Sequence, residues 1–146
     1  MYDFHYNYIK TKYANKAKLL FTDTDSLMYD IQTEDFYADI AEDVELKFDT
    51  SDYPKDHPSG IKTGINKKVI GMFKDEACGI QIEEFVGLRA KLYSYKMADE
   101  EHKKCKGIKK RVFEQQITHD DYKNCLFSRQ KQFRKMNVFR SHLHDV

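Results

Sequence analysis

The chain has 146 residues, 40% of them hydrophobic and 34% charged, which is the composition of a globular domain with a modest core. No apolar stretch approaches the roughly 18 to 20 residues of a membrane helix, and the first residues do not resemble a signal peptide, so we expect an intracellular protein with no membrane partner. Its three cysteines are far apart and form no Cys-x-x-Cys pair, which argues against a disulfide framework and a zinc ribbon.

Charge is unevenly distributed along the chain, although the net charge is only +1. Residues 1–60 hold 6 Lys and Arg against 13 Asp and Glu, whereas residues 61–146 hold 19 against 11. This asymmetry indicates that the second part faces a polyanion and the first faces solvent or metal. A basic run alone is usually a solvated surface, so a motif is needed to give the charge a function.

The N-terminal third predicts two helices on either side of a β-hairpin. Residues 2–13 are rich in aromatic side chains and have the pattern of a helix packed into a core. Residues 17–21 and 26–31 are expected to be strands that flank a turn. Thr33 is the expected N-cap of an amphipathic helix over residues 34–48 with an acidic outer face.

The remainder predicts mainly strands, after a surface loop at 49–64 that contains both prolines. Thr118 is expected to cap a helix that runs through Leu126, and a polar turn is expected at 98–102. Strands are predicted at 68–74, 80–97, 104–112 and from Val138 onward. This order of elements predicts an α+β fold, because neither alternating βαβ units nor a glycine-rich phosphate loop is present.

Asp23 and Asp25 are the candidate metal ligands, because they lie one residue apart between two apolar segments. Residues two apart in an extended segment point the same way, so we expect both carboxylates to aim at one point while Thr24 points away. Mg²⁺ prefers carboxylate oxygens and usually takes only one or two from protein. An EF-hand is excluded, because Leu27 and Met28 stand where that loop needs an oxygen donor and a glycine.

Two chemistries use a hydrophobic strand that ends in Asp-x-Asp, namely nucleotidyl transfer on a polymerase palm and sugar transfer from nucleotide sugars. In the second, the motif lies in a parallel, nucleotide-binding sheet, which the order of elements here does not predict. A metal-dependent glycosyltransferase is therefore the less favoured alternative.

Several blocks of the sequence match one known family. Residues 21–26, Phe-Thr-Asp-Thr-Asp-Ser, resemble its motif C, and residues 91–93, Lys-Leu-Tyr, resemble its Lys-x-Tyr element. Residues 106–108, Lys-Gly-Ile, resemble the Lys-Gly-hydrophobic step that follows. The family is the family B DNA polymerases. Residues 2–6 and 55–60 are similar to one branch of it, the protein-primed polymerases of Polinton (Maverick) transposons.

The resemblance implies a fragment of a DNA-directed DNA polymerase, with a partial palm and its antiparallel sheet over residues 1–110 and a truncated thumb over 111–146. Asp23 and Asp25 would be catalytic residues and ligands of a two-metal Mg²⁺ site, which Mn²⁺ could also occupy. Primer-template DNA, a deoxynucleoside triphosphate and a terminal protein primer would be the partners, and a eukaryotic host would imply a nuclear location.

Five residues are the expected DNA contacts. The family resemblance implies that Lys91 and Tyr93 position the primer, and that Gly107 lets backbone amides approach the strand. Other lysines of the same region add phosphate attraction that does not depend on sequence. The expected DNA-binding residues are Lys91, Tyr93, Lys106, Gly107 and Lys109.

The sequence also departs from the family pattern. The motif A Asp and the Lys-containing helix of motif B lie upstream of motif C in the family, and residues 1–146 contain neither. Ala14 stands where relatives often have glycine, and Cys78 replaces another expected turn glycine. We therefore expect no polymerisation by this chain alone, even with Mn²⁺. A transposon remnant without activity is an alternative of a different class, for which an exposed sheet edge predicts poor solubility or a molten state.

Overall fold

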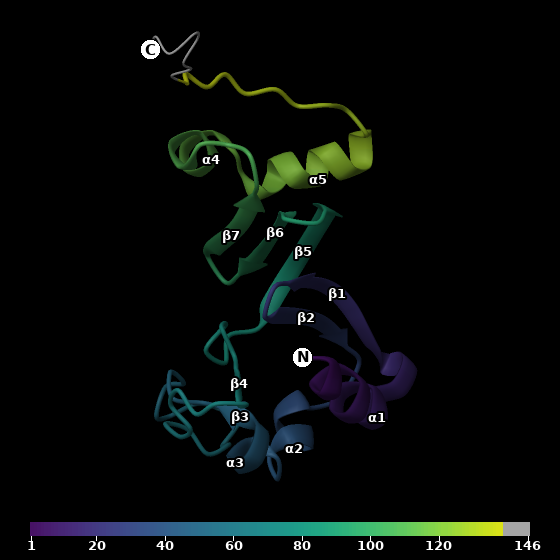
Figure 1. The fold of residues 1–146 in the computed structure, drawn as a ribbon, viewed down its shortest axis with the longest axis vertical. Helices are drawn as coiled ribbons and strands as arrows, with labels where there is room; N and C mark the ends of the chain where they lie inside the picture. The colour runs from purple at the N-terminus through teal and green to yellow at the C-terminus, as the bar shows by residue number, and fades with distance from the viewer. Residues whose placement is uncertain (139–146) are drawn as a thin grey trace, which may run out of the picture. The chain divides into compact units, whose positions relative to one another are not determined.

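The computed structural model describes residues 1–138 and contains both helices and strands, as an α+β fold requires (Figure 1). The chain divides into two compact units, Met1–Ile82 and Glu83–Val146, which we call unit 1 and unit 2 and describe separately. The expected division into palm and thumb at residue 110 is a family-based boundary and stays a prediction. Within residues 1–138, no helix is both long enough and apolar enough to cross a bilayer.

Unit 1 begins with the expected helical segment. It consists of the π-helix η1 (Phe4–Ile9), the helix α1 (Lys10–Tyr13) and the 3₁₀ turn η2 (Ala14–Lys16). One face of this segment is buried, and the side chains of Phe4, Tyr29, Ile31, Phe36 and Phe48 pack against it. The buried cluster consists of Tyr8, Ile9, Tyr13 and Ala17. Aromatic burial of this size accounts for a stable helix without an N-terminal side-chain cap.

The predicted β-hairpin follows and is confirmed. Strands β1 (Ala17–Asp23) and β2 (Ser26–Ile31) pair antiparallel, with a bulge between Leu19 and Phe21. Residues Tyr29 and Ile31 of β2 pack against the buried cluster. This packing fixes which face of the hairpin is buried, because side chains alternate along a strand.

The single helix expected over 34–48 is wrong, because two short helices occupy this stretch, α2 (Phe36–Ile40) and α3 (Val44–Lys47). The N-cap is Asp35 and not Thr33, since the Asp35 carboxylate accepts the N–H groups at the start of α2. The Thr33 hydroxyl instead donates to a carboxylate within α2, at 2.6 Å.

Asp43 lies where the helix is interrupted. Its carboxylate accepts a hydrogen bond from the Tyr8 hydroxyl at 2.7 Å and from the Lys12 ammonium at 2.7 Å. These contacts hold the turn between α2 and α3 against α1 and η1. Tertiary contacts of this kind override the weak preference of a sequence for one continuous helix.

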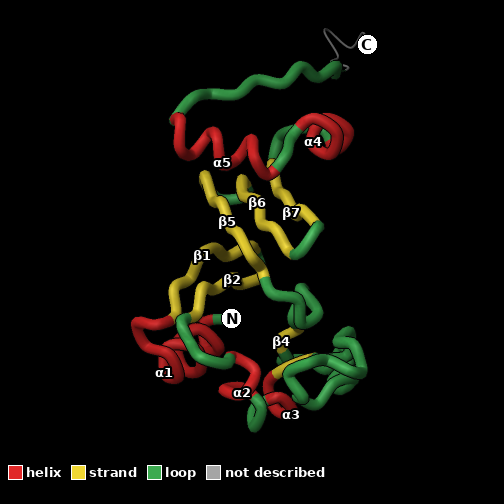
Figure 2. The backbone as a smooth tube through the Cα atoms, turned by 180° about the vertical axis from the view of Figure 1, so that it is seen from behind, coloured by secondary structure: helices red, strands yellow, loops and turns green. Residues whose placement is uncertain are grey.

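A long loop occupies residues 50–72, between the paired parallel strands β3 (Phe48–Asp49) and β4 (Phe73–Lys74) (Figure 2). The loop expected at 49–64 is therefore confirmed, whereas the strand expected at 68–74 is wrong except for its last two residues. The loop is held against α3 and β3, because the Asn66 side chain donates to carbonyls of these elements, among them that of Phe48 at 2.9 Å.

Unit 2 contains a three-stranded sheet in the order β5–β6–β7. Its strands are β5 (Ile82–Arg89), β6 (Leu92–Met97) and β7 (Glu100–Cys105), with β6 and β7 antiparallel. The β-structure expected over 80–97 is thus confirmed as two strands with a turn between them. The polar turn expected over 98–102 is shorter, because β7 already begins at Glu100.

Two helices complete the unit, and α5 packs against the sheet (Figure 1). The strand expected over 104–112 is wrong beyond Cys105, because the chain turns at Gly107, which has a left-handed φ of 98°, and helix α4 (Lys110–Gln116) follows. Helix α5 (His119–Ser128) begins as predicted, since Thr118 caps it in a reciprocal capping box. Beyond Val138, the expected final strand lies outside the described residues.

Candidate functional site

The tip of the β1–β2 hairpin carries the two candidate metal ligands. Asp23 is the last residue of β1 and is half-buried, whereas Thr24 and Asp25 form the two-residue turn and are exposed. Asp23 pairs with Ser26, the first residue of β2. The expectation that both carboxylates lie in one extended segment is therefore wrong, because Asp25 is part of the turn itself.

Thr24 has an unusual backbone conformation. Of the two turn residues only Thr24 has a positive φ, 56°, as at the first central position of a type II′ turn. Glycine is the ordinary residue there, and a β-branched residue with positive φ is rare. The Thr24 hydroxyl donates to Oδ1 of Asp23 at 3.4 Å. The hairpin thus holds the two carboxylates on either side of a strained residue.

The chemistry of this tip suits a hard divalent cation. Carboxylate oxygens of two aspartates, with water and a substrate phosphate, make up a usual Mg²⁺ environment. Among residues 1–138 the structure assembles no cluster of three or more His, Cys, Asp and Glu side chains that could hold a metal. Asp23 and Asp25 are therefore the protein ligands to test.

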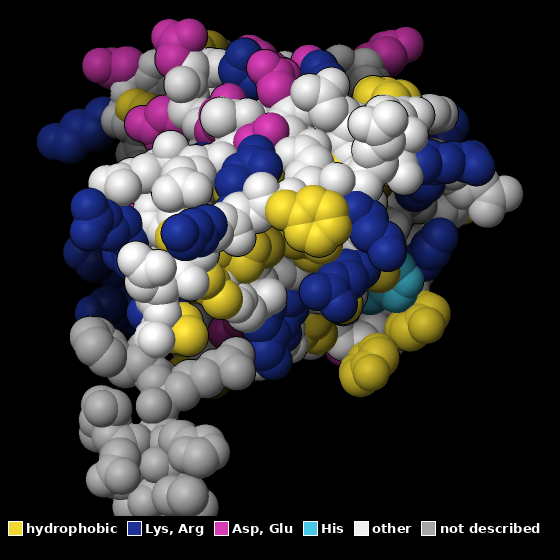
Figure 3. Space-filling model, turned by 90° about the horizontal axis from the view of Figure 1, so that it is seen from above, with side chains coloured by type: hydrophobic (Ala, Val, Ile, Leu, Met, Phe, Trp, Pro, Cys, Tyr) yellow, Lys and Arg dark blue, Asp and Glu magenta, His cyan; other side chains and the backbone are white. Residues whose placement is uncertain are grey.

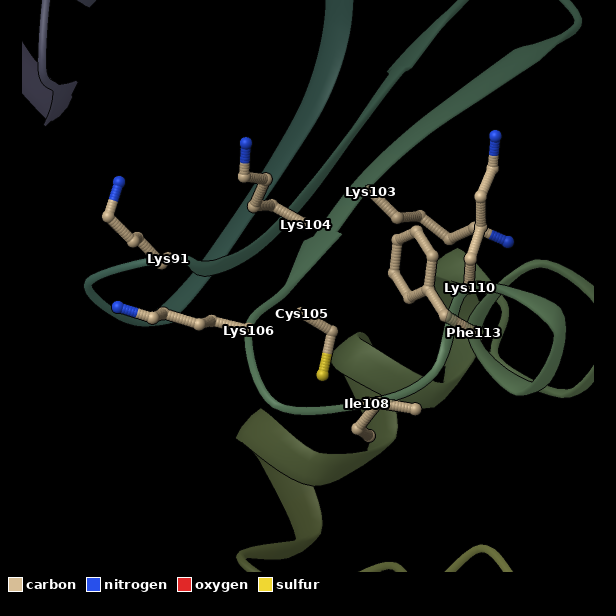
Figure 4. A pocket seen from close by; sticks show the side chains of 8 residues that line it. All are labelled: Lys91, Lys103, Lys104, Cys105, Lys106, Ile108, Lys110 and Phe113. Carbon is tan, nitrogen blue, oxygen red and sulfur yellow. The ribbon is translucent and has the colours of Figure 1, made fainter. Parts of the chain in front are cut away.

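A second candidate region lies in unit 2, in a shallow pocket of about 430 Å³ that we call the lysine pocket (Figure 4). Its lining residues come from the β5–β6 turn, from β7, from the connection after β7 and from α4. They are Lys91, Lys103, Lys104, Cys105, Lys106, Ile108, Lys110 and Phe113. Five lysines around one hollow favour a polyanionic ligand.

Sheet pairing brings together two segments that are distant in the sequence. The N–H of Lys106, just after β7, donates to the carbonyl of Lys91 in the β5–β6 turn at 3.1 Å. Lys91 itself has a left-handed φ of 56°, which turns the chain sharply between the two strands. Lys91 and Lys106 were both expected to contact DNA, and the structure places them in the same pocket.

The other expected DNA contacts are arranged differently. Tyr93 faces Lys104 across the β6–β7 pair, and its ring centroid lies 6.3 Å from that of Phe85. Gly107 lies beside the lysine pocket and lines a neighbouring cavity of about 330 Å³. Lys109 does not line the lysine pocket, because its ammonium binds the carbonyl of Asn137. Of the five expected DNA contacts, Lys91 and Lys106 line the lysine pocket, whereas Tyr93, Gly107 and Lys109 do not.

Electrostatics in unit 2 favour an anion. Residues 83–138 hold 14 Lys and Arg against 8 Asp and Glu. Lys and Arg side chains surround hydrophobic ones on the face that carries α4 and α5 (Figure 3). The Lys103 side chain is only 14% exposed, and its ammonium donates to the carbonyl of Ile117 at 2.5 Å. This hydrogen bond restricts the position of the ammonium group.

Phe113 is the pocket residue that sequence reasoning missed. It lies in α4, and the Lys103 ammonium is 5.7 Å from the centroid of its ring. The expected strand over 104–112 ended just before it, so its place in a helix that faces β7 was not anticipated. A prediction of helix for residues 110–116 would have identified Phe113 as a helical residue, but not its contact with β7.

A Ser-His-Glu arrangement, in which the serine and histidine are buried and the glutamate is exposed, lies elsewhere in unit 2. The Ser94 hydroxyl lies 2.8 Å from Nδ1 of His119, and Nε2 of His119 lies 3.0 Å from Oε2 of Glu84. Ser94 is 0% exposed, so no substrate can reach its hydroxyl. This arrangement therefore stabilises the packing of α5 on the sheet and is not a nucleophilic site.

Comparisons of the chain with protein-family models, with curated proteins and with solved structures gave no match.

Proposed function

We propose that this chain takes part in template-directed DNA synthesis as a segment of a DNA polymerase palm. The β1–β2 hairpin would supply metal ligands, and unit 2 would contact the phosphate backbone of primer-template DNA. The observation that carries the proposal is the Asp23-Thr24-Asp25 tip, where a left-handed Thr24 separates two carboxylates. Strained backbone of this kind is concentrated at functional sites.

The reaction would be phosphoryl transfer to a primer hydroxyl. In such reactions two cations stabilise the attacking and leaving oxygens of an in-line displacement. Asp23 and Asp25 would bind the cations, with Asp25 on the exposed turn and Asp23 anchored at the end of β1. The family resemblance requires a third carboxylate and a nucleotide-binding lysine helix, so residues 1–146 alone are proposed to be inactive.

The lysines of unit 2 would hold DNA without reading its sequence. Lys91 and Lys106 lie together beside Lys104, and phosphate oxygens are the natural partners of such a group. Tyr93 is adjacent to Lys104 across the sheet and would pack against the sugar or hydrogen-bond to a backbone oxygen. Such contacts give affinity that falls steeply with salt.

Sugar transfer is less well supported. That chemistry uses an Asp-x-Asp motif in a parallel nucleotide-binding sheet, whereas β1 and β2 are antiparallel and joined by a two-residue turn. An inactive transposon remnant remains a distinct alternative. A broad thermal transition without cooperativity would favour the remnant, and a sharp cooperative one would count against it.

The proposal is tested by the binding of fluorescently labelled primer-template DNA to residues 1–146 over a series of salt concentrations. We expect Lys91→Ala and Lys106→Ala each to weaken binding and to reduce the slope of log affinity against log salt by about 1. Lys96→Ala is the matched control, because Lys96 lies on β6 and does not line the lysine pocket. An affinity that does not change with salt concentration, or an equal loss of affinity with Lys96→Ala, would contradict the proposed DNA contact.

A further inference from the structure

The lysine pocket has two different sides. Figure 4 shows Lys91, Lys104 and Lys106 on one side and the ring of Phe113, with Lys103 and Lys110, on the other. Cys105 and Ile108 lie between the two sides. The pocket therefore offers three lysines at one end and, at the other, an aromatic ring flanked by two further lysines. A nucleotide has the same two-part chemistry, with an anionic phosphate and an aromatic base.

The aromatic side is fixed by its surroundings. Phe113 is half-buried in α4, and its N–H donates to the carbonyl of Lys109 at 3.0 Å. Its neighbour Val112 is buried, which holds this turn of the helix against the unit. Lys103 is held beside the ring by the carbonyl of Ile117. A ring that is already ordered loses little entropy when a ligand packs against it.

The cationic side is also held by the backbone. The hydrogen bond between Lys106 and Lys91 fixes the β5–β6 turn against the end of β7. Lys104 is the residue before Cys105 on the same strand, so three ammonium groups originate within two adjacent segments. This grouping suits successive phosphates of one strand more than a single small anion.

We infer that the lysine pocket binds an unpaired nucleotide of a DNA strand, with its base against Phe113 and its flanking phosphates on Lys91, Lys104 and Lys106. This inference rests on the proposed DNA contact of unit 2 and narrows it to an unstacked base. A volume of about 430 Å³ falls within the usual range of small-ligand pockets.

The lysine pocket is expected to accept an unpaired base and not a base stacked within a duplex. In a duplex, each base is stacked on its neighbours, so its face cannot reach a protein side chain unless the nucleotide is flipped out. A single strand can splay a base onto an aromatic ring, and such stacking is tolerant of sequence. Phe113 is therefore expected to contribute to the binding of single strands and not to that of duplexes.

The test measures binding of residues 1–146 to a labelled single-stranded oligothymidylate and to a blunt duplex, each over a range of salt concentrations. We expect Phe113→Leu to weaken single-strand binding by at least about fivefold, without a change in the salt slope, and to leave duplex binding unchanged. Phe113→Tyr keeps the aromatic face and should bind as the wild type does. Phe127→Ala is the control, because Phe127 is 78% exposed and does not line the pocket.

A second measurement needs no variant and so does not depend on whether substitutions at Phe113 fold. Photocrosslinking of the wild-type chain to an oligonucleotide that contains 5-iododeoxyuridine should place the adduct on Phe113. An adduct mapped only to other residues would overturn the inference. So would a Phe113→Leu variant that binds single strands as tightly as the wild type, or that loses duplex binding equally.

Failure of the inference is distinguishable from failure of the proposed function. If Lys106→Ala weakens both probes with a smaller salt slope while Phe113→Leu has no effect, only the unpaired-base inference is overturned. If the wild-type chain binds neither probe, the proposed DNA contact fails and the inference fails with it. If Phe113→Leu weakens single-strand binding while Lys106→Ala weakens the binding of neither probe, the base contact is supported and the phosphate contacts are wrong.

Discussion

The side-chain hydroxyl of Ser94 lies 2.8 Å from Nδ1 of His119, and both side chains are buried, which joins the middle of β6 to the first turn of α5. Nε2 of His119 faces the Glu84 carboxylate at 3.0 Å. Since a carboxylate can only accept, Nε2 carries a proton, and in the neutral ring Nδ1 accepts from Ser94. Every polar atom of the imidazole is thereby paired.

Ser94→Ala is expected to destabilise the protein by about 1 to 3 kcal/mol, because it leaves Nδ1 of His119 buried without its donor. Urea unfolding measures the change. Ser128→Ala is the matched control, since Ser128 lies at the exposed end of α5 and its hydroxyl makes only local hydrogen bonds, to the Asn124 carbonyl and from the Gln130 N–H. A cost no greater than that of Ser128→Ala, which is expected to stay within about 0.5 kcal/mol, would show that the buried bond is not stabilising.

Ala14→Gly is expected to stabilise the protein by about 1 kcal/mol. Ala14 has a φ of 49°, in the left-handed region that is unfavourable for any residue with a Cβ. It is also exposed, so removal of its methyl group costs little burial. Thermal or urea unfolding provides the measurement. Ala38→Gly in α2 is the counterpart, and it should instead destabilise by about 1 kcal/mol, because glycine is a poor helix former.

Local signals in the sequence predicted several elements well. The side chains of Thr118 and Asp121 each accept a hydrogen bond from the other's backbone N–H. Because this capping box spans only four residues, the start of α5 could be predicted without knowledge of tertiary contacts. Two short apolar segments on either side of the Asp-x-Asp turn likewise predicted β1 and β2. The two positions where the sequence resemblance led us to expect glycine, Ala14 and Cys78, both have positive φ in the structure, 49° and 53°.

Other elements depended on contacts between distant residues. The helix expected over 34–48 is broken where Asp43 meets Tyr8 and Lys12, which lie more than 30 residues earlier. At the candidate site, the sequence singled out Lys91 and Lys106 separately, but only sheet pairing places them in one pocket. Phe113 joins them because α4 packs beside β7, a contact that no local pattern encodes.

Unit 1 is expected to lose stability in acid partly through Asp43. The hydrogen bond from the Lys12 ammonium, followed by that from the Tyr8 hydroxyl, lowers the pKa of Asp43 below its ordinary value of about 3.9. The folded state therefore binds the proton more weakly than the unfolded state. The resulting stabilisation is complete above the unfolded pKa and is lost as the pH falls through the lower, folded pKa.

Asp43→Asn should accordingly flatten the acid side of the profile of unfolding free energy against pH. Urea unfolding between about pH 2.5 and pH 7 covers the relevant window. Asp56→Asn provides the comparison, because Asp56 is exposed in the loop between β3 and β4. If the Asp56 and Asp43 variants flatten the profile equally, the effect comes from net charge and not from the bonds to Lys12 and Tyr8.

Asp25→Asn is expected to weaken the binding of Mn²⁺ to residues 1–146 by about tenfold or more, since a carboxylate beside a divalent ion contributes attraction that a neutral amide does not. Loss of the free Mn²⁺ signal in electron paramagnetic resonance gives the affinity, and competition with Mg²⁺ shows whether both ions share the site. Asp30→Asn changes the charge equally, at an exposed position on β2 of the same hairpin. An equal loss with Asp30→Asn would mean that Mn²⁺ responds only to the overall negative charge. A loss with Asp25→Asn but not with Asp30→Asn would locate the ion at the hairpin tip, where Thr24 holds the turn in its left-handed conformation.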